Sequence, residues 1–254
     1  MTASAKLAVV TGGCSGLGQA SAEFLLANGW HVVIFDLNKD SGDEIAQKMH
    51  PSNCWFDYVD VTSSALVEAA VNKLAGKEIR LLINCAGVAP AKRTLNREGE
   101  AMPLDDFAKV ININLVGSFN VARVVAAAMA KNSSINEDRG CIINTASVAG
   151  YEGQIGQTAY AASKAGLIGL SLPMARDLAP LGIRVNAIAP GIMGTPMLLA
   201  MPDKVQEALA SNVQHPKRLG IPEEFAKLAM HIAENSYING ETIRLDGALR
   251  MPPK

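Results

Sequence analysis

Residues 7–18 read LAVVTGGCSGLG, and this stretch decides the fold. Its first four residues are apolar, as in a strand that is buried on both faces of a sheet. The glycines at 12, 13, 16 and 18 then permit a tight turn and a close approach of the backbone to a phosphate group, and residues 19–27 predict a helix. A strand, a glycine-rich turn and a helix in this order are typical of a dinucleotide-binding unit in a doubly wound α/β fold.

The rest of the chain repeats this alternation of short apolar runs and longer segments with helical spacing. The pattern predicts strands at residues 7–10, 31–35, 55–61, 81–84, 141–145, 184–189 and 242–245. It predicts helices at 19–27, 42–49, 64–74, 104–129, 160–178 and 223–233. We therefore expect one domain over residues 1–254, a Rossmann-like doubly wound parallel sheet with helices on both faces. Residues 89–103 and 192–220 interrupt the alternation after strands and are the expected substrate loops.

Composition narrows the class of partner. Of the 254 residues 49% are hydrophobic and 19% are charged, and the formal net charge is −1 without a basic tract, so we expect neither a nucleic-acid nor a membrane partner. The four cysteines are scattered and have no companion histidines at ligand spacing, so no metal is expected. No apolar run approaches the ~20 residues of a membrane span. The N-terminus lacks a secretory or Arg-rich leader, which favours a cytoplasmic protein, with an uncleaved organellar signal as the alternative.

An acidic residue indicates which dinucleotide the turn binds. Asp36 ends the second predicted strand, about twenty residues after the glycines, where a carboxylate accepts hydrogen bonds from the ribose hydroxyls of NAD and repels the 2′-phosphate of NADP. The glycine turn contains no lysine or arginine, so NAD is the expected cofactor. The expected contacts from the turn are Gly12, Ser15, Gly16, Leu17 and Gly18.

Asp60 and Val61 end the third predicted strand. Their position is that of residues that hydrogen-bond an adenine. The alternative, about equally favoured, is that Asp60 caps the helix that follows at Ser63 and Ser64.

Tyr160 and Lys164 stand four residues apart in a predicted helix, so both side chains lie on one face. A positive charge about 4 Å away stabilises a phenolate by roughly 1 kcal/mol in bulk water and about 4 kcal/mol at an intermediate dielectric. We therefore expect Lys164 to lower the pKa of Tyr160 and to make it a general acid or base. The alternative is a pair that only shares a solvated helix face.

These motifs together resemble the short-chain dehydrogenase/reductase family over essentially the full chain. The matching residues are Thr11–Gly18, Asn84-Cys85-Ala86-Gly87, Asn114, Ser147, Tyr160, Lys164 and Pro190-Gly191. Cys85 stands where many members have asparagine. The resemblance implies that Tyr160 exchanges a proton with the substrate, that Lys164 lowers its pKa and holds the nicotinamide ribose, and that Ser147 hydrogen-bonds the substrate oxygen. Asn114 would anchor a water that links Lys164 to solvent.

The resemblance also assigns further cofactor contacts around the nicotinamide. They are Asn84, Ala86, Gly87, Tyr160, Lys164, Pro190, Gly191, Ile192 and Thr195. Other interpretations stay open for single residues: Ser147 as a strand-end cap, Asn114 as a satisfied core amide, and Thr195 as a cap before Pro196.

Longer stretches are similar to one subgroup of this family, the 3-hydroxyacyl-CoA dehydrogenases of type 2, also described as multifunctional hydroxysteroid dehydrogenases. They are residues 142–149, 152–157, 172–180 and 239–251. The similarity implies NAD-dependent interconversion of an L-3-hydroxyacyl-CoA and its 3-ketoacyl-CoA, in fatty-acid or branched-chain amino-acid degradation. Gln154 is then expected to face the substrate, together with Ser147 and Tyr160. Lys92, Arg93 and Arg97 either meet the CoA phosphates or belong to a solvated loop.

Two rival functions remain at this stage: a dehydrogenase of steroids or small secondary alcohols, and a binding or scaffold protein without catalysis. The helices predicted at 104–129 and 160–178 are long and strongly apolar, which indicates self-association. The family resemblance implies a homotetramer.

Overall fold

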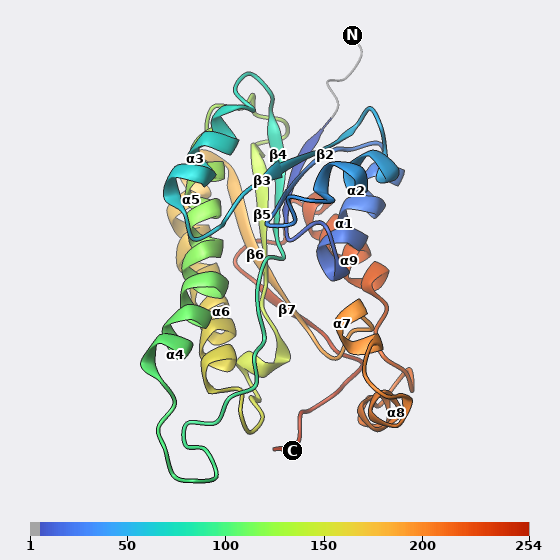
Figure 1. Cartoon of the computed structure of the whole chain (residues 1–254). Helices are drawn as coiled ribbons and strands as arrows, with labels where there is room; N and C mark the ends of the chain where they lie inside the picture. Colours follow the sequence, from blue (N-terminus) through green and yellow to red (C-terminus); the bar gives the residue numbers. More distant parts are fainter. Residues whose placement is uncertain (1–5, 254) are drawn as a thin grey trace.

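The computed structural model describes residues 6–253, so the N-terminal residues 1–5, on which the expectation about a leader rests, lie outside it. Seven parallel strands form one sheet in the order β3-β2-β1-β4-β5-β6-β7 (Figure 1). They are β1 Leu7–Thr11, β2 His31–Asp36, β3 Cys54–Tyr58, β4 Ile79–Asn84, β5 Gly140–Thr145, β6 Ile183–Pro190 and β7 Thr242–Leu245. The doubly wound parallel sheet predicted from the sequence is confirmed.

Helices cover both faces of the sheet, because neighbouring strand residues point to opposite sides. Along β1, Leu7 and Val9 belong to one apolar core, and Ala8 and Val10 belong to the other. The first face carries α3 Ser64–Asn72, α4 Leu104–Ile111, α5 Ser118–Met129 and α6 Thr158–Leu178. The second carries α1 Gly16–Ala27, α2 Gly42–Met49 and α9 Pro222–Glu234 (Figure 1).

The long helix predicted at 104–129 is continuous but not uniform. A π-helical segment, η1 Asn112–Gly117, separates α4 from α5. By length and composition, Leu104–Met129 is the one helical stretch in the described part of the chain that could cross a membrane. Its apolar residues are interrupted by polar and charged ones, so it contains no continuous apolar run of that length. Half of its most apolar window is buried inside the protein. A π-helical turn inside an α-helix is frequent at functional sites, and Asn114 lies within this one.

Both expected substrate loops lie beyond the carboxyl ends of the strands (Figure 1). Residues 89–103 form an exposed excursion that is closed by a bridge between Leu95 and Ala101. Residues 192–220 contain two short helices that the sequence did not predict, α7 Pro196–Leu199 and α8 Asp203–Ser211. The sequence also placed the end of β3 too late, at residue 61, because Val59 and Val61 are buried without being part of the strand.

Candidate active site

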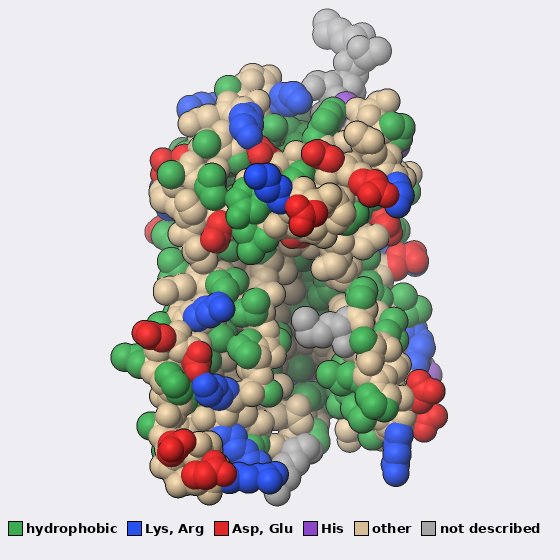
Figure 2. All heavy atoms as spheres, in the orientation of Figure 1, with side chains coloured by type: hydrophobic (Ala, Val, Ile, Leu, Met, Phe, Trp, Pro, Cys, Tyr) green, Lys and Arg blue, Asp and Glu red, His purple; other side chains and the backbone are tan. Residues whose placement is uncertain are grey.

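A cavity of about 1150 Å³ opens at the carboxyl ends of the strands (Figure 2). It lies where β1 pairs with β2 on one side and with β4 on the other, so the strand order reverses there. Open α/β sheets bind their ligands at such a reversal. Among the described lining residues are these predicted cofactor contacts: Gly12, Ser15, Gly16, Leu17, Gly18, Asp36, Asp60, Val61, Ala86, Gly87 and Thr195.

The glycine turn between β1 and α1 is a close-packed cradle. Gly12 and Gly16 have φ values of 65° and 54°, which favour glycine. A Cβ atom on Gly18 would lie 2.2 Å from the carbonyl oxygen of Gly12, so no larger residue fits there. The N-terminus of α1 faces the cavity through Gly16, Leu17 and Gly18, and such a terminus stabilises a phosphate.

Thr11 holds this cradle to the next strand. Its hydroxyl oxygen accepts hydrogen bonds from the backbone N–H groups of Cys85 and Ala86, at 3.1 and 3.0 Å. This role of Thr11 was not predicted. The signal for it in the sequence is a hydroxyl side chain at the last residue of β1, directly before the first glycine.

Asp36 ends β2 at the wall of the cavity. Its carboxylate accepts hydrogen bonds from the backbone N–H of Cys14 at 3.0 Å and from that of Asn38 at 3.1 Å. The turn and β2 are therefore fastened to each other at the position where a ribose is expected. The glycine cradle and this carboxylate fit the phosphates and the ribose of a nicotinamide dinucleotide.

Asp60 also lies on the cavity wall, and it does not cap α3. Its Oδ1 accepts hydrogen bonds from the backbone N–H and the hydroxyl of Thr62, at 2.9 and 2.7 Å. The cap is Ser63, whose hydroxyl oxygen accepts a hydrogen bond from the N–H of Leu66 at 3.3 Å. Of the two interpretations of Asp60, the helix cap is wrong, and the adenine contact stays a prediction.

Six predicted cofactor residues are not among the described residues that line the cavity: Asn84, Tyr160, Lys164, Pro190, Gly191 and Ile192. Asn84 is buried, and its amide donates to Asn144 Oδ1 at 2.9 Å and to the carbonyl oxygen of Ser118 at 3.2 Å. It thus joins β4 to β5 and α5, and its contact with a cofactor stays a prediction. Gly191 follows β6, and its N–H donates to the carbonyl oxygen of Leu245 at 2.9 Å.

Ser147, Tyr160 and Lys164 come together beside the end of β5. Ser147 lies close enough to the Tyr160 phenol to lower its pKa, and Ser147 Oγ accepts a hydrogen bond from the N–H of Ala149 at 3.1 Å. Ser147 therefore caps the short 3-10 helix Val148–Gly150, as the alternative interpretation had it, while it also contacts the tyrosine. Lys164 Nζ donates to the carbonyl oxygen of Thr145 at 2.6 Å and lies 5.7 Å from the centroid of the Tyr160 ring.

Lys164 is placed next to the cavity as well as to Tyr160. A Cβ atom built on Gly87, which lines the cavity, would lie 3.8 Å from Lys164 Nζ. Of the three expected catalytic residues, Lys164 thus approaches the cavity at Gly87, although none of Ser147, Tyr160 and Lys164 is among the described residues that line the cavity itself.

The predicted lowering of the Tyr160 pKa is wrong for this structure. Burial raises the pKa of the Tyr160 phenol, and the hydrogen bond with Ser147 offsets this only in part. Burial also lowers the pKa of Lys164 to about 8. Lys164 is not among the groups that shift the Tyr160 pKa here, so the expected lowering by the lysine is not seen in this structure.

Asn114 is a fully satisfied buried amide in the π-helical segment. Its Oδ1 accepts from the N–H of Val88 at 2.8 Å, and its Nδ2 donates to the carbonyl oxygen of Val88 and to Ser163 Oγ, at 2.9 and 3.0 Å. The core-amide interpretation therefore describes its side chain. Asn114 ties the segment after β4 to α6 one residue from Lys164, and its role in a water path stays a prediction.

The side-chain amide of Gln154 donates to the carbonyl oxygen of Pro252 at 3.0 Å, a contact across 98 residues of sequence that the sequence did not predict. Its contact with a substrate stays a prediction. In the 89–103 loop, Lys92 forms an ion pair with Asp106 of α4, and Arg93 and Arg97 are exposed. Among the described residues, no three His, Cys, Asp or Glu side chains gather as metal ligands.

This fold and this site are those of a class, the dinucleotide-dependent dehydrogenases. The comparisons with known proteins agree. Residues 6–206 match the short chain dehydrogenase family, and the chain belongs to this family. It is therefore an oxidoreductase that acts on a CH–OH group with a nicotinamide dinucleotide, NAD or NADP.

Several relatives match over nearly their whole length. The chain is 52% identical to the 3-hydroxyacyl-CoA dehydrogenase type-2 of Bos taurus over 97% of this chain and 96% of that protein. It is 50% identical to the protein of that name from Drosophila melanogaster, over 97% and 98%. The crystal structure of 3-hydroxyacyl-CoA dehydrogenase type-2 from Mycobacterium avium superposes with a TM-score of 0.91 at 45% identity and covers 98% of this chain and 97% of that one.

Proposed function

We propose that this protein interconverts L-3-hydroxyacyl-CoA and 3-ketoacyl-CoA with NAD as its cofactor. The observation that carries the proposal is a sequence identity of 45% to 52%, over nearly the whole chain, to several 3-hydroxyacyl-CoA dehydrogenases of type 2. The adjacent Ser147, Tyr160 and Lys164 argue against a binding protein without catalysis.

In carbonyl reduction, the substrate oxygen accepts hydrogen bonds from Ser147 and Tyr160, and the proton of Tyr160 passes to that oxygen. NADH, when bound, supplies the hydride that C3 of the substrate receives. The raised pKa of Tyr160 keeps its proton in place at neutral pH, which suits the acid role. In oxidation, the same steps run in reverse, and Tyr160 must first be deprotonated.

NAD rather than NADP is supported by Asp36. Its carboxylate is held at the cavity wall by two backbone N–H groups, so it cannot swing away from a 2′-phosphate without losing both hydrogen bonds. Leu37 and Asn38 follow it, and neither carries a positive charge.

For the CoA end, Arg93 and Arg97 in the 89–103 loop are the proposed phosphate contacts. Their loop lies beyond the carboxyl ends of the strands, and both side chains are exposed. Lys92 already forms an ion pair with Asp106, so we expect it to contribute less to binding the CoA phosphates.

We also propose a homotetramer. Large apolar side chains are exposed on α4, η1, α5 and α6: Leu104, Val116, Phe119 and Leu172, with Leu104 78% exposed. Apolar surface of this kind on neighbouring helices marks a protein–protein interface. Light scattering at micromolar concentration should give four chains per particle, and a monomer would contradict the proposal.

The substrate proposal is tested by steady-state rates with acetoacetyl-CoA, a ketosteroid and a small ketone, each with NADH and with NADPH. We expect the highest kcat/KM with acetoacetyl-CoA and NADH. Negligible turnover of acetoacetyl-CoA beside rapid turnover of the ketosteroid or the small ketone would overturn the proposed substrate while leaving the dehydrogenase class intact.

A further inference from the structure

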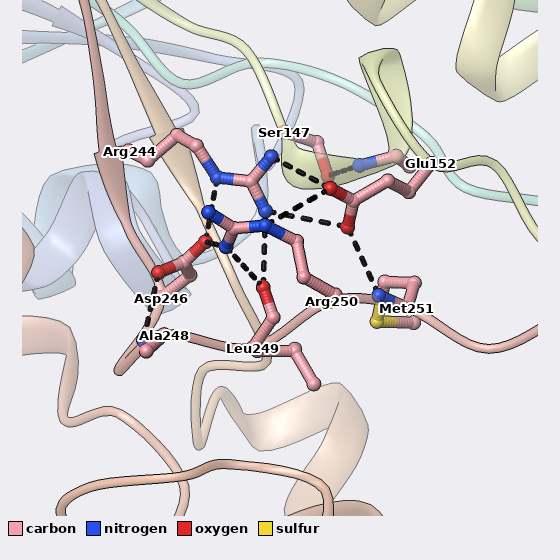
Figure 3. Close-up of polar contacts among 9 residues, drawn as sticks. Ser147, Glu152, Arg244, Asp246, Ala248, Leu249, Arg250 and Met251 are labelled. Carbon is pink, nitrogen blue, oxygen red and sulfur yellow. Dashed lines mark hydrogen bonds and ion pairs between the residues drawn. The ribbon is translucent and has the colours of Figure 1, made fainter.

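Four charged side chains form a compact cluster at the carboxyl end of β7 (Figure 3). We call it the C-terminal clasp, and it consists of Glu152, Arg244, Asp246 and Arg250. Arg244 donates to Glu152 Oε1 at 2.9 Å and to Asp246 Oδ2 at 2.7 Å. Arg250 contacts the same two carboxylates at 3.5 and 3.2 Å. The two positive and two negative charges balance, and three of the side chains are at most 24% exposed.

The clasp fastens the last residues of the chain. Gly247 and Ala248 have φ values of 57° and 61°, so the chain reverses directly after β7. Leu249 is then fully buried and anchors the returning segment. Its carbonyl oxygen accepts from Arg244 at 3.0 Å and from Arg250 at 2.7 Å. The tail is thereby held on the main body rather than left in solvent.

The returning tail lies along the loop between Ser147 and Tyr160. The N–H of Met251 donates to Glu152 Oε2 at 2.9 Å. Beyond it, the carbonyl oxygen of Pro252 accepts from Gln154 Nε2, and that of Pro253 accepts from the N–H of Ile155, both at 3.0 Å. Three hydrogen bonds thus connect residues 251–253 to residues 152–155.

Glu152 is also joined to the catalytic serine through the backbone. Its N–H donates to the carbonyl oxygen of Val148 at 2.9 Å, and the N–H of Gly150 donates to that of Ser147 at 3.0 Å. Downstream, the N–H of Gln157 donates to the carbonyl oxygen of Gln154, and α6 with Tyr160 begins at Thr158. The loop that carries Ser147 at one end and Tyr160 at the other is therefore anchored in its middle to the tail.

We propose that Glu152 is a positioning residue, and that through it the C-terminal tail sets the geometry of Ser147 relative to Tyr160. This inference rests on the proposed function, in which these two hydroxyl groups bind the substrate oxygen. The carboxylate accepts hydrogen bonds from Arg244 of β7 and from Met251 of the tail at once, so its loss removes the contacts that join both to the loop at residue 152. Misplacement of a catalytic group by about 1 Å lowers a rate by about 100-fold.

The proposal predicts an effect on chemistry without an effect on cofactor binding. Among the described residues that line the dinucleotide cavity, none belongs to 147–157 or to 244–253. An overall loss of structure would instead reduce both properties in proportion.

The test uses the full-length enzyme with Glu152→Gln, Glu152→Ala and a deletion of residues 251–254. The matched control is Glu223→Gln, which breaks an exposed ion pair with Lys227 on α9, away from the site. For each variant, kcat and KM are measured with acetoacetyl-CoA and NADH, and the Kd and stoichiometry of NADH by fluorescence titration. We expect kcat to fall by about 10- to 100-fold in Glu152→Ala and in the deletion, less in Glu152→Gln, and not in the control, with the NADH Kd changed less than about twofold.

Wild-type kcat in Glu152→Ala and in the deletion would overturn the proposal. A parallel loss of kcat and of NADH stoichiometry would also overturn it, because that result describes a partly unfolded enzyme. If the wild type does not turn over acetoacetyl-CoA, the proposed substrate is wrong, and the same variants are compared with the ketone that the wild type does reduce. The wild-type rate with acetoacetyl-CoA therefore tests the proposed substrate, and the ratio of variant kcat to wild-type kcat tests the positioning role of Glu152.

Discussion

Replacing Lys164 with methionine should remove activity and, at the same time, change how stability depends on pH. Lys164 is 6% exposed, and burial lowers its pKa from the ordinary 10.5 to about 8. Between these two pH values the unfolded chain binds the lysine proton and the folded protein does not. By linkage, the free energy of unfolding of the wild type therefore gains a contribution as the pH rises through this window.

The size of the effect on the free energy of unfolding follows from the lowering of the Lys164 pKa. About 2.5 pKa units at ~1.4 kcal/mol each correspond to a penalty of about 3 kcal/mol, which is fully present below pH 8 and absent above about pH 10.5. Methionine has a similar length and no charge, so it escapes this penalty. It also loses the 2.6 Å hydrogen bond to the carbonyl oxygen of Thr145, which costs about 1–3 kcal/mol. The absolute stability of Lys164→Met therefore depends on both effects. The difference in unfolding free energy between wild type and variant changes with pH only through the pKa of the lysine.

The assay is urea unfolding of wild type and Lys164→Met without cofactor, at equal protein concentration and at several pH values from 7 to 9.5. From pH 8 to 9.5 the wild type should gain about 2 kcal/mol relative to the variant, and below pH 8 the difference should be nearly constant. A difference that does not change with pH would refute a buried lysine with a lowered pKa.

Three further variants test separate parts of the site. Asp36→Ala should lower the preference of kcat/KM for NADH over NADPH by about 10- to 100-fold, because a charged acceptor is lost, and an unchanged ratio would remove Asp36 from cofactor choice. Gly18→Ala should abolish NADH binding in a fluorescence titration, since its Cβ would lie 2.2 Å from the Gly12 carbonyl oxygen, whereas Gly169→Ala, with open space at its Cβ, should bind normally. Tyr160→Phe should lower kcat by about 10²- to 10⁴-fold, and undiminished turnover would reject the proton-transfer role.

Local sequence patterns were sufficient to predict the sheet and the glycine-rich turn that faces the cavity. The strands are apolar throughout because both of their faces are covered, and the spacing of Gly12, Gly16 and Gly18 follows from a turn with no room for side chains. Helix 104–129 was predicted in its full length, but not its π-helical turn at Asn114, because side-chain periodicity does not distinguish one inserted residue.

Contacts between distant segments could not be predicted. The hydrogen bond from Gln154 to Pro252 was not predicted, because the fold and a chain reversal bring together residues that are 98 positions apart in the sequence. Arg244 and Glu152 carry opposite charges, but only the fold makes them partners. The pKa of Tyr160 was misjudged for a similar reason: the charge on Lys164 was visible in the sequence, and the burial of the phenol, which raises its pKa, was not.

The central claim is that Tyr160 and its neighbours reduce the C3 carbonyl of a 3-ketoacyl-CoA with hydride from NADH. Acetoacetyl-CoA is incubated with NADH that carries deuterium at both hydrogens of nicotinamide C4, and the product is analysed by mass spectrometry. Wild type should form 3-hydroxybutyryl-CoA with one deuterium at C3 at a substantial rate, and Tyr160→Phe should form almost none. Absence of this labelled product from the wild type, beside rapid oxidation of NADH with a steroid or a simple ketone, would contradict the account.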